Sequence, residues 1–376
     1  MKGMVYTMKV LILSCSTGEG HNSAAAAVRA AFDSRGIEYE QRDPVSFRSD
    51  RATELVNSTY NNIIKKAPGV FGVIYKAGEI VDNSRLKSPI YKTNAVLAEP
   101  IYNYAKENGF DAILSTHLFG MEACTAIRYE LGQEIPSFGV LTDYTMVPFF
   151  DDCRLDCFFT PHEALTKDLV AAGIPEETIR PTGIPVAPKF SRHIPKAEAR
   201  EKLGLDPDKK IFVVMSGGVG GGNVAGICSE LMRVLGSDSK VYVMTGHNDD
   251  LRAKLENEYA ANDRIATVPF TKEVNVWFNA ADILLSKAGG LSSTEAAVAN
   301  IPLIHVGAIP GCETANAEFF EARGMSINTK DEVEAAKAAL ELSRSPERQQ
   351  KMIECQRREI NPDAAGEIAD FVKSFI

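Results

Sequence analysis

The chain has few cysteines, no long apolar run and no excess of basic residues. Its seven cysteines are scattered and odd in number, so a disulfide framework is not expected and a reducing cytoplasm is predicted. No apolar stretch approaches the roughly 18 residues of a membrane-spanning helix. The start MKGMVYTMKV lacks a signal-peptide core. The formal net charge of -9 argues against nucleic acid as the main partner.

Patterns for metal and ATP sites are also missing. Cys153 and Cys157 alone do not make a metal site. Four histidines show no ligand-like spacing and receive no role: His162, His193, His247 and His305. The sequence GxxxxGK is absent, which argues against a P-loop ATPase.

Short apolar runs that alternate with helical segments are abundant. The chain has 376 residues, with 45% hydrophobic residues and 28 glycines, which suits a two-domain α/β protein. A strand at 9–14 is followed by a glycine turn and a helix that we expect to be capped by Asn22 or Ser23 and to end at Gly36. Further strands are predicted at 37–39, 111–116, 137–141, 157–160, 180–184, 210–215, 241–245, 264–270, 283–286 and 302–306.

The alternation predicts two successive doubly wound parallel sheets facing each other across a cleft. A proline-dense segment, 181–195, is the predicted linker. We therefore expect an N-terminal domain at 1–185 and a C-terminal domain at 186–360. Residues 361–376 have helical apolar spacing and are predicted to pack back onto the first domain.

Polar side chains follow three of the predicted strands in the first half. His21 comes after the first strand, His117 after the strand at 111–116, and Asp143 after the strand at 137–141. In open parallel sheets ligands bind outside the carboxyl ends of the strands. These three side chains are therefore expected to converge on one crevice.

Residues 281–320 combine a strand, a glycine turn and a helix start. Gly289 and Gly290 allow close backbone approach, and free amides at a helix start attract a phosphate. Glu295, one turn further on, can accept hydrogen bonds from two ribose hydroxyls. Glu313 and Asn316 in the next loop suit the hydroxyls of a sugar. The stretch predicts one wall of a nucleotide-sugar site.

A dinucleotide site is an alternative use of the glycine loops. Gly18 and Gly20 are followed by Ser23, which fails the third position of GxGxxG. Gly220, Gly222 and Ala225 fit the relaxed form. The signal is weak, because glycine turns after strands occur in every Rossmann-like fold.

Residues 51–92 interrupt the alternation with seven basic and three acidic residues, among which lies the apolar stretch PGVFGVIYKAGEI. Basic and aromatic residues interleaved in this way suit an anionic membrane surface. A buried helix with a solvated basic face is the alternative, and the sequence leaves both open.

Several motifs together resemble one enzyme family. They are STGEGHNSAAAAV, SGGVGGGN, KAGGLSSTEAAVANIPLI and GCETANAEFF. They are similar to those of the monogalactosyldiacylglycerol synthase and processive diacylglycerol glucosyltransferase family. More distantly, the second domain resembles the lipid-linked N-acetylglucosaminyltransferase of peptidoglycan synthesis. The resemblance implies a GT-B glycosyltransferase with two Rossmann-like domains, which uses a UDP-sugar without a catalytic metal or other cofactor and inverts the anomeric centre.

The resemblance also implies roles for individual residues. His21 matches the base or orienting group for the acceptor hydroxyl. From its predicted place at the same crevice, and not from the resemblance, Asp143 is expected to orient or charge-stabilise His21. Gly18 and Gly20 are assigned to the acceptor side. His117 is assigned there from its place at a strand end, and a structural histidine bonded to a neighbouring loop is an equally open alternative for it. The donor side comprises Gly218 and Gly220 in the loop that closes over the donor, Phe270 and Thr271 at uracil, Gly289, Gly290, Leu291 and Ser292 at the diphosphate, Glu295 at ribose, and Glu313 and Asn316 at the sugar. Cys312 replaces the family's usual glutamine, which leaves the donor hexose open.

We therefore predict an enzyme that moves a hexose from a UDP-sugar to diacylglycerol or a glycosyl-diacylglycerol. It would be cytoplasmic and peripherally bound to the anionic inner face of the cell membrane. One alternative is a UDP-sugar epimerase of the same architecture, which would need carboxylates converging on the sugar ring. The other is a non-catalytic nucleotide-sugar-binding regulator.

Overall fold

The computed structural model describes residues 7–15, 19–47, 88–215, 223–308 and 310–376. The chain divides into two compact units. Unit 1 contains Met1–Ala187 and Pro362–Ile376, and unit 2 contains Pro188–Asn361. Within the described residues, each unit is built on a six-stranded sheet in which every pair of neighbouring strands is parallel.

The sheet of unit 1 has the strand order β2-β1-β3-β4-β5-β6. Its strands are β1 (Lys9–Leu13), β2 (Glu38–Arg42), β3 (Ala112–Ser115), β4 (Ser137–Val140), β5 (Cys157–Phe159) and β6 (Ile179–Arg180). Its longer helices are α1 (Glu19–Arg35), α4 (Pro89–Ala95), α5 (Ala98–Glu107), α6 (Leu118–Tyr129), α7 (Thr166–Ala171) and α16 (Ala364–Phe375). Short 3-10 turns are η1 (Pro44–Phe47), η2 (Phe150–Asp152), η3 (Glu163–Leu165) and η4 (Glu176–Thr178).

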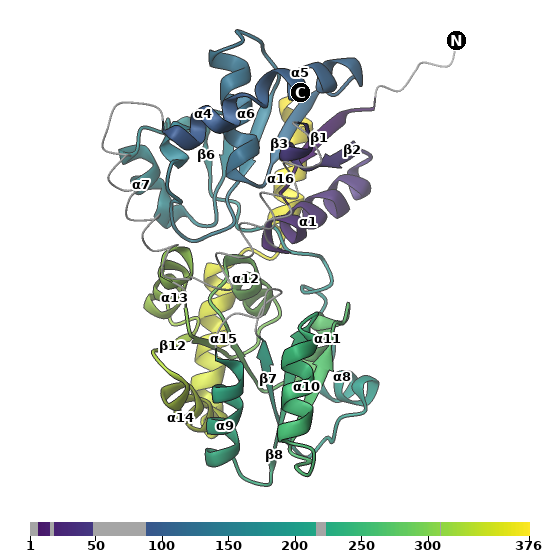
Figure 1. Cartoon of the computed structure of the whole chain (residues 1–376), viewed down its shortest axis with the longest axis vertical. Helices are drawn as coiled ribbons and strands as arrows, with labels where there is room; N and C mark the ends of the chain where they lie inside the picture. The colour runs from purple at the N-terminus through teal and green to yellow at the C-terminus, as the bar shows by residue number, and fades with distance from the viewer. Residues whose placement is uncertain (1–6, 16–18, 48–87, 216–222, 309) are drawn as a thin grey trace. The chain divides into compact units, whose positions relative to one another are not determined.

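The helices α1 and α16 cover one face of this sheet, although more than 300 residues separate them in the chain (Figure 1). Alternate strand residues such as Val10 and Ile12 pack against Val28 and Phe32 of α1. The apolar face of α16 completes this core with Ile368 and Val372, both fully buried. Burying each such side chain contributes a free energy of about 1.5–3 kcal/mol, and this accounts for the attachment of the last helix to unit 1.

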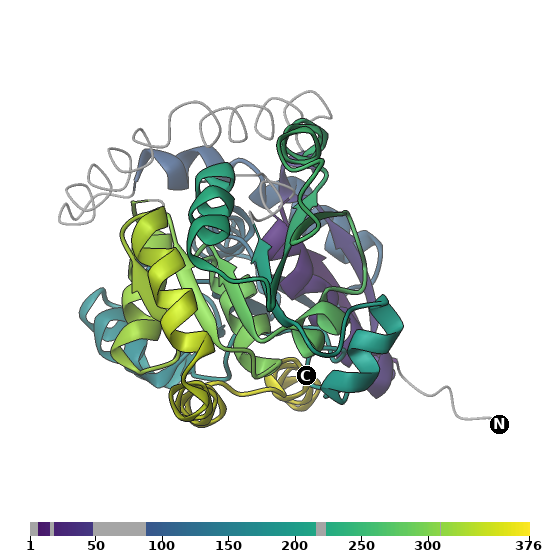
Figure 2. The same ribbon diagram turned by 90° about the horizontal axis from the view of Figure 1, so that it is seen from below.

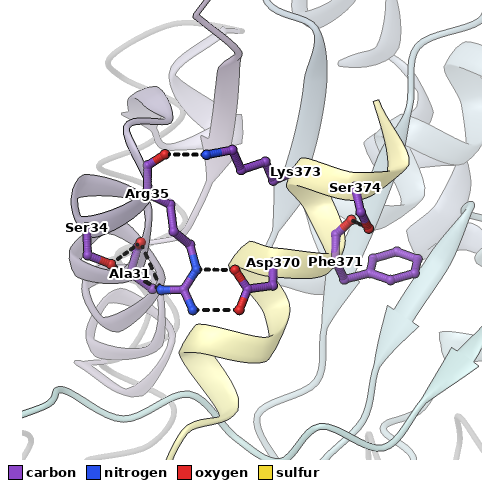
Figure 3. Close-up of polar contacts among 7 residues, drawn as sticks. All are labelled: Ala31, Ser34, Arg35, Asp370, Phe371, Lys373 and Ser374. Carbon is purple, nitrogen blue, oxygen red and sulfur yellow. Dashed lines mark hydrogen bonds and ion pairs between the residues drawn. The ribbon is translucent and has the colours of Figure 1, made fainter.

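Polar contacts at the edge of this helix pair are drawn in Figure 3. The guanidinium of Arg35, at the end of α1, donates to both carboxylate oxygens of Asp370 on α16, at 2.6 and 2.7 Å. Lys373 Nζ donates to the carbonyl oxygen of Arg35 at 2.8 Å. Lys373 and the Arg35 guanidinium complement the carboxyl ends of the two helices, where cations are favoured.

The sheet of unit 2 has the strand order β12-β11-β10-β7-β8-β9. Its strands are β7 (Lys210–Met215), β8 (Ser239–Gly246), β9 (Ile265–Pro269), β10 (Ile283–Ser286), β11 (Leu303–Val306) and β12 (Ile327–Thr329). Its helices are α8 (Lys196–Leu203), α9 (Val224–Val234), α10 (Asp249–Glu258), α11 (Val274–Ala280), α12 (Gly290–Val298), α13 (Cys312–Ala322), α14 (Glu332–Ser343) and α15 (Pro346–Glu359).

Helices lie on both faces of the unit 2 sheet, as the view from below shows (Figure 2). Residues of β7, β8, β10 and β11 pack on one face against α9 and α14, with Ile227, Leu231 and Leu342 among the buried contacts. The helix α12 contacts β10 and β11. Since both faces are covered, the central strands β7 and β10 are nearly continuous buried apolar runs, as expected for parallel sheets. The order of the strands places β10 and β7 in the middle of the sheet.

The predicted start of the first long helix is wrong. The helix α1 begins at Glu19, so Asn22 and Ser23 lie inside it rather than at its cap. The side chain of Asn22 accepts hydrogen bonds from Ser14 Oγ at 2.7 Å and Gln41 Nε2 at 3.2 Å. It therefore joins the ends of β1 and β2 to the helix. None of the described helices is long and apolar enough to cross a bilayer.

Candidate active site

His21 lies in the first turn of α1, directly beyond the carboxyl end of β1. Its Nδ1 is 2.8 Å from the carbonyl oxygen of Thr116, which follows β3. A carbonyl oxygen only accepts, so Nδ1 carries the proton and Nε2 keeps its lone pair. Thr142 Oγ1, beyond β4, lies 3.1 Å from the same Nδ1. The ends of two neighbouring strands thus fix the ring and its tautomer.

Asp143 acts on His21 through its charge. Burial lowers the pKa of His21 below the usual value, and the negative charge of Asp143 opposes this effect, followed by the hydrogen bond to Thr116. The net result is a histidine that is neutral near pH 7. A neutral imidazole with a free lone pair can accept a proton.

His117 caps the helix α6. Its Nδ1 accepts the backbone N–H of Phe119 at 3.2 Å, so the neutral ring carries its proton on Nε2. The rings of His117 and His21 meet edge to face, with centroids 4.6 Å apart. Burial, and then the charge of His21, holds the pKa of His117 well below its usual range. The capping role is established by geometry, and the predicted acceptor-side role stays a prediction.

The glycine turn of unit 2 follows β10 and starts α12. Gly289 is the N-cap residue, with an extended backbone at φ -71° and ψ 135°, and no side chain among the described residues caps the helix. Ser292 Oγ donates to Gly289 O at 3.2 Å, and Thr294 Oγ1 donates to Gly290 O. Within the part of the chain that the structure describes, no side chain caps the first amides of α12, from Gly290 to Ser292, so they can bind an anion.

Glu295 lies in the second turn of α12 and is partly buried. Burial raises its pKa to about 7, and the charge of Lys189 opposes the rise. A carboxyl group with this pKa changes its charge near neutral pH. In its ionised form it offers two strong acceptor oxygens, as a ribose diol requires.

Phe270 directly follows β9 and has 54% of its surface exposed. One face of its ring stacks on His247, with centroids 4.2 Å apart and 18° between the planes. Thr271 Oγ1 accepts the backbone N–H of Glu273 at 3.0 Å and so shapes the turn before α11. The exposed ring has room for a base, which keeps the predicted uracil contact open.

Glu313 and Asn316 lie in the first two turns of the helix α13 and not in a loop as predicted, and these turns contact the residues just before the glycine turn. Lys287 Nζ lies 2.7 Å from Glu313 Oε1. Asn316 Nδ2 donates to Ala288 O at 3.0 Å, and this side chain is fully buried. Sugar contacts for Glu313 and Asn316 remain predictions. Lys287 was given no role from the sequence, although a lysine directly before a phosphate-type turn is a usable signal.

His305 is a structural residue. It is fully buried, with Ser293 Oγ 2.9 Å from Nε2 and Ser326 Oγ 3.1 Å from Nδ1. Burial lowers its pKa to about 3. It ties α12 to β11 and β12 as a neutral group.

Both halves of the chain match known families. Residues 21–186 match the family described as monogalactosyldiacylglycerol (MGDG) synthase, and residues 187–368 match the glycosyltransferase family 28 C-terminal domain. The chain is a glycosyltransferase built from an MGDG synthase domain followed by a glycosyltransferase family 28 C-terminal domain. A processive diacylglycerol beta-glucosyltransferase of Bacillus pumilus is 28% identical over 330 residues, which cover 85% of this chain and 82% of that protein.

Solved structures similar to the glycosyltransferase confirm the predicted GT-B-like fold. Acinetobacter baumannii MurG superposes with a TM-score of 0.63 and 17% identity, covering 98% of this chain and 99% of that one. A UDP-GlcNAc 2-epimerase from Neisseria meningitidis, bound to UDP-GlcNAc, gives 0.62 and 14%, covering 98% and 100%. Two enzyme classes share this fold, so the assignment to the glycosyltransferases depends on the family matches.

Several predicted residues of the glycosyltransferase lie outside the described residues. They are Gly18 on the acceptor side and Gly218 and Gly220 in the glycine loop after β7. Most of the basic segment at 51–92 also lies outside them. Gly20 is described and lies in the first turn of α1 beside His21.

Proposed function

We propose that this glycosyltransferase moves a hexose from a UDP-sugar to the hydroxyl of diacylglycerol or of a glycosyl-diacylglycerol at an anionic membrane surface. The observation that carries the proposal is the adjoining pair of family matches, which together run from residue 21 to residue 368. The acceptor named for the Bacillus relative supports a diacylglycerol acceptor.

The reaction needs a proton acceptor on one side and an anion site on the other. In the proposed step, the acceptor oxygen bonds to the anomeric carbon while the bond from that carbon to the β-phosphate oxygen breaks. The electron pair of the broken bond leaves with UDP, and the hydroxyl proton passes to His21 Nε2. Attack from the side opposite the leaving group inverts the anomeric centre.

The geometry supports these assignments. The hydrogen bond to Thr116 leaves His21 Nε2 with its lone pair. The open amides at the start of α12 supply preorganised hydrogen bonds and positive potential for the diphosphate. Glu295 accepts the ribose hydroxyls, and Phe270 contacts the uracil.

The test uses purified protein and liposomes that contain diacylglycerol and anionic phospholipid. UDP-glucose, UDP-galactose and UDP-N-acetylglucosamine are supplied separately, and UDP release and glycolipid are measured. We expect lipid-dependent UDP release with one donor, undiminished by a chelator, and a product of inverted anomeric configuration by NMR. Epimerisation of a UDP-sugar without lipid-dependent UDP release would favour the epimerase alternative.

A further inference from the structure

Lys287 is a partly buried cation next to the proposed diphosphate turn. It directly follows β10, and only Ala288 separates it from Gly289. Its side chain is 17% exposed and its Nζ lies 2.7 Å from Glu313 Oε1, in a carboxylate side chain that is 18% exposed. Lysine is seldom buried to this degree without a paired charge. Among the described residues, Glu313 is the one acidic group found within ion-pair distance of Lys287.

A second contact fixes the same segment. Asn316 follows Glu313 by three residues on α13 and donates to Ala288 O at 3.0 Å. The side chain of Lys287 and the backbone of Ala288 are therefore both anchored to the beginning of α13. This anchoring sets the position of the lysine relative to the turn at Gly289.

Lys287 also faces open space. It lines a cavity of about 40 Å³ together with Met215, Ser286 and Gly307, which lie at the carboxyl ends of β7, β10 and β11. Ligands of parallel α/β sheets bind at this end of the strands. Lys287 thus borders a small cavity at the ligand-binding end of the sheet, which is otherwise lined by the starts of α9 and α14.

A bound nucleotide-sugar would bring negative charge next to Lys287. The open amides of α12 act as roughly half a positive charge, whereas a diphosphate is a dianion that becomes more negative as the sugar departs. We propose that Lys287 pairs with Glu313 in the empty site and with the donor's diphosphate in the occupied site. In the occupied site the carboxylate of Glu313 then accepts hydrogen bonds from the hydroxyls of the sugar. This inference rests on the proposed function.

The experiment measures binding of UDP, UMP and uridine to the full chain by calorimetry. Lys287→Ala should weaken UDP binding by about 10- to 100-fold, since a charge-assisted contact is lost, and leave uridine unaffected. Lys287→Arg should retain most of the affinity. Lys196→Ala is the matched control, because Lys196 Nζ also lies 2.7 Å from a carboxylate, Asp282 Oδ1, just before the amino end of the same strand. It should bind all three ligands like the wild type.

A double variant separates this role from simple neutralisation of Glu313. Lys287→Met combined with Glu313→Gln removes both charges, so no unpaired carboxylate remains. The proposal predicts the same loss of UDP affinity as in Lys287→Ala. Recovery of wild-type UDP affinity would mean that Lys287 only compensates Glu313, and the inference would be overturned.

The single variant Glu313→Gln tests the other half of the exchange. It should bind UDP at least as tightly as the wild type, because Lys287 then has no ion pair to break, and it should lose several-fold of the extra affinity that the wild type has for the UDP-hexose donor over UDP. An unchanged extra affinity for that donor would overturn the role of Glu313. If the wild type itself binds UDP no better than uridine, the proposed donor site fails, and the inference with it. If the wild type binds UDP and Lys287→Ala does so equally well, only the inference fails.

Discussion

Each unit places polar side chains at the carboxyl ends of its strands, but unit 1 holds them by backbone hydrogen bonds and unit 2 by an ion pair. In unit 1, His21 is bonded to a backbone carbonyl and His117 to a backbone N–H, and burial keeps both rings neutral. In unit 2, the charges of Lys287 and Glu313 are paired, and the first amides of α12 are left open. The first arrangement suits transfer of a proton, whereas the second suits an anion.

Backbone groups explain the difference. A carbonyl oxygen can hold only a protonated nitrogen, and an amide can hold only an unprotonated one, so neutral histidines gain fixed tautomers without any charged partner. An ammonium and a carboxylate, by contrast, change partners when a more highly charged ligand enters. The comparison therefore predicts that changes in unit 1 affect the rate of transfer and that changes in unit 2 affect nucleotide affinity.

The largest effect is expected at His21. Replacing it by asparagine should lower kcat by about 10²- to 10⁴-fold, as loss of a general base does, and leave the affinity for UDP unchanged. His162→Asn is the control, since His162 caps a 3-10 turn in the same unit through Ala164 N. It should retain wild-type kcat. If UDP affinity falls as much as kcat in the His21 variant, the separation of roles between the units is wrong.

Glu295 provides the corresponding test in unit 2. Glu295→Ala should weaken binding of both UDP and uridine by about tenfold, because both ligands carry the ribose diol. Glu318→Ala, on the exposed side of α13, is the control and should bind both normally. Isothermal titration calorimetry measures the two affinities. An unchanged affinity for uridine in Glu295→Ala would remove the ribose assignment.

The raised pKa of Glu295 makes that affinity dependent on pH. With a pKa of about 7, the carboxyl group is mostly protonated at pH 6 and mostly ionised at pH 8. The ionised form is the better acceptor, so uridine should bind several-fold more weakly at pH 6 than at pH 8. Uridine is the suitable probe because it has no phosphate that titrates in this range. Glu295→Gln should bind with an affinity that does not change between the two pH values.

Replacing Asp143 should cause a smaller change in unit 1, namely a shift of the pH dependence of kcat in one direction. Burial lowers the pKa of His21, so the acid limb of the kcat profile should lie below the usual histidine range. Asp143 raises this pKa, and Asp143→Asn should therefore move the limb to still lower pH. The measurement is kcat against pH with saturating donor and lipid. A shift to higher pH would contradict a purely electrostatic role for Asp143.

The sequence predicted every described strand except β12, and it predicted the side-chain partners poorly. The strand at 283–286 was predicted to the residue, because the strand is itself a short run of buried, mostly apolar residues that ends at the glycine turn. The start of α1 was missed because Asn22 bonds to Ser14 and Gln41, which a local cap rule does not consider. The pairing of Lys287 with Glu313 joins residues 26 apart in the chain. Only the packing of α13 against the end of β10 reveals it.

The smallest effect concerns α16, the last helix of unit 1. Unit 1 takes this helix from the far end of the chain, whereas unit 2 is formed by one continuous segment. The Arg35–Asp370 pair has good geometry, but the Asp370 side chain is 66% exposed, so solvent and salt screen it. Asp370→Asn should barely change Tm. Ile368→Ala, on the buried face of the same helix, should cost about 2–5 kcal/mol in the free energy of unfolding. Equal losses in the two variants would mean that the ion pair, rather than apolar burial, attaches α16 to unit 1.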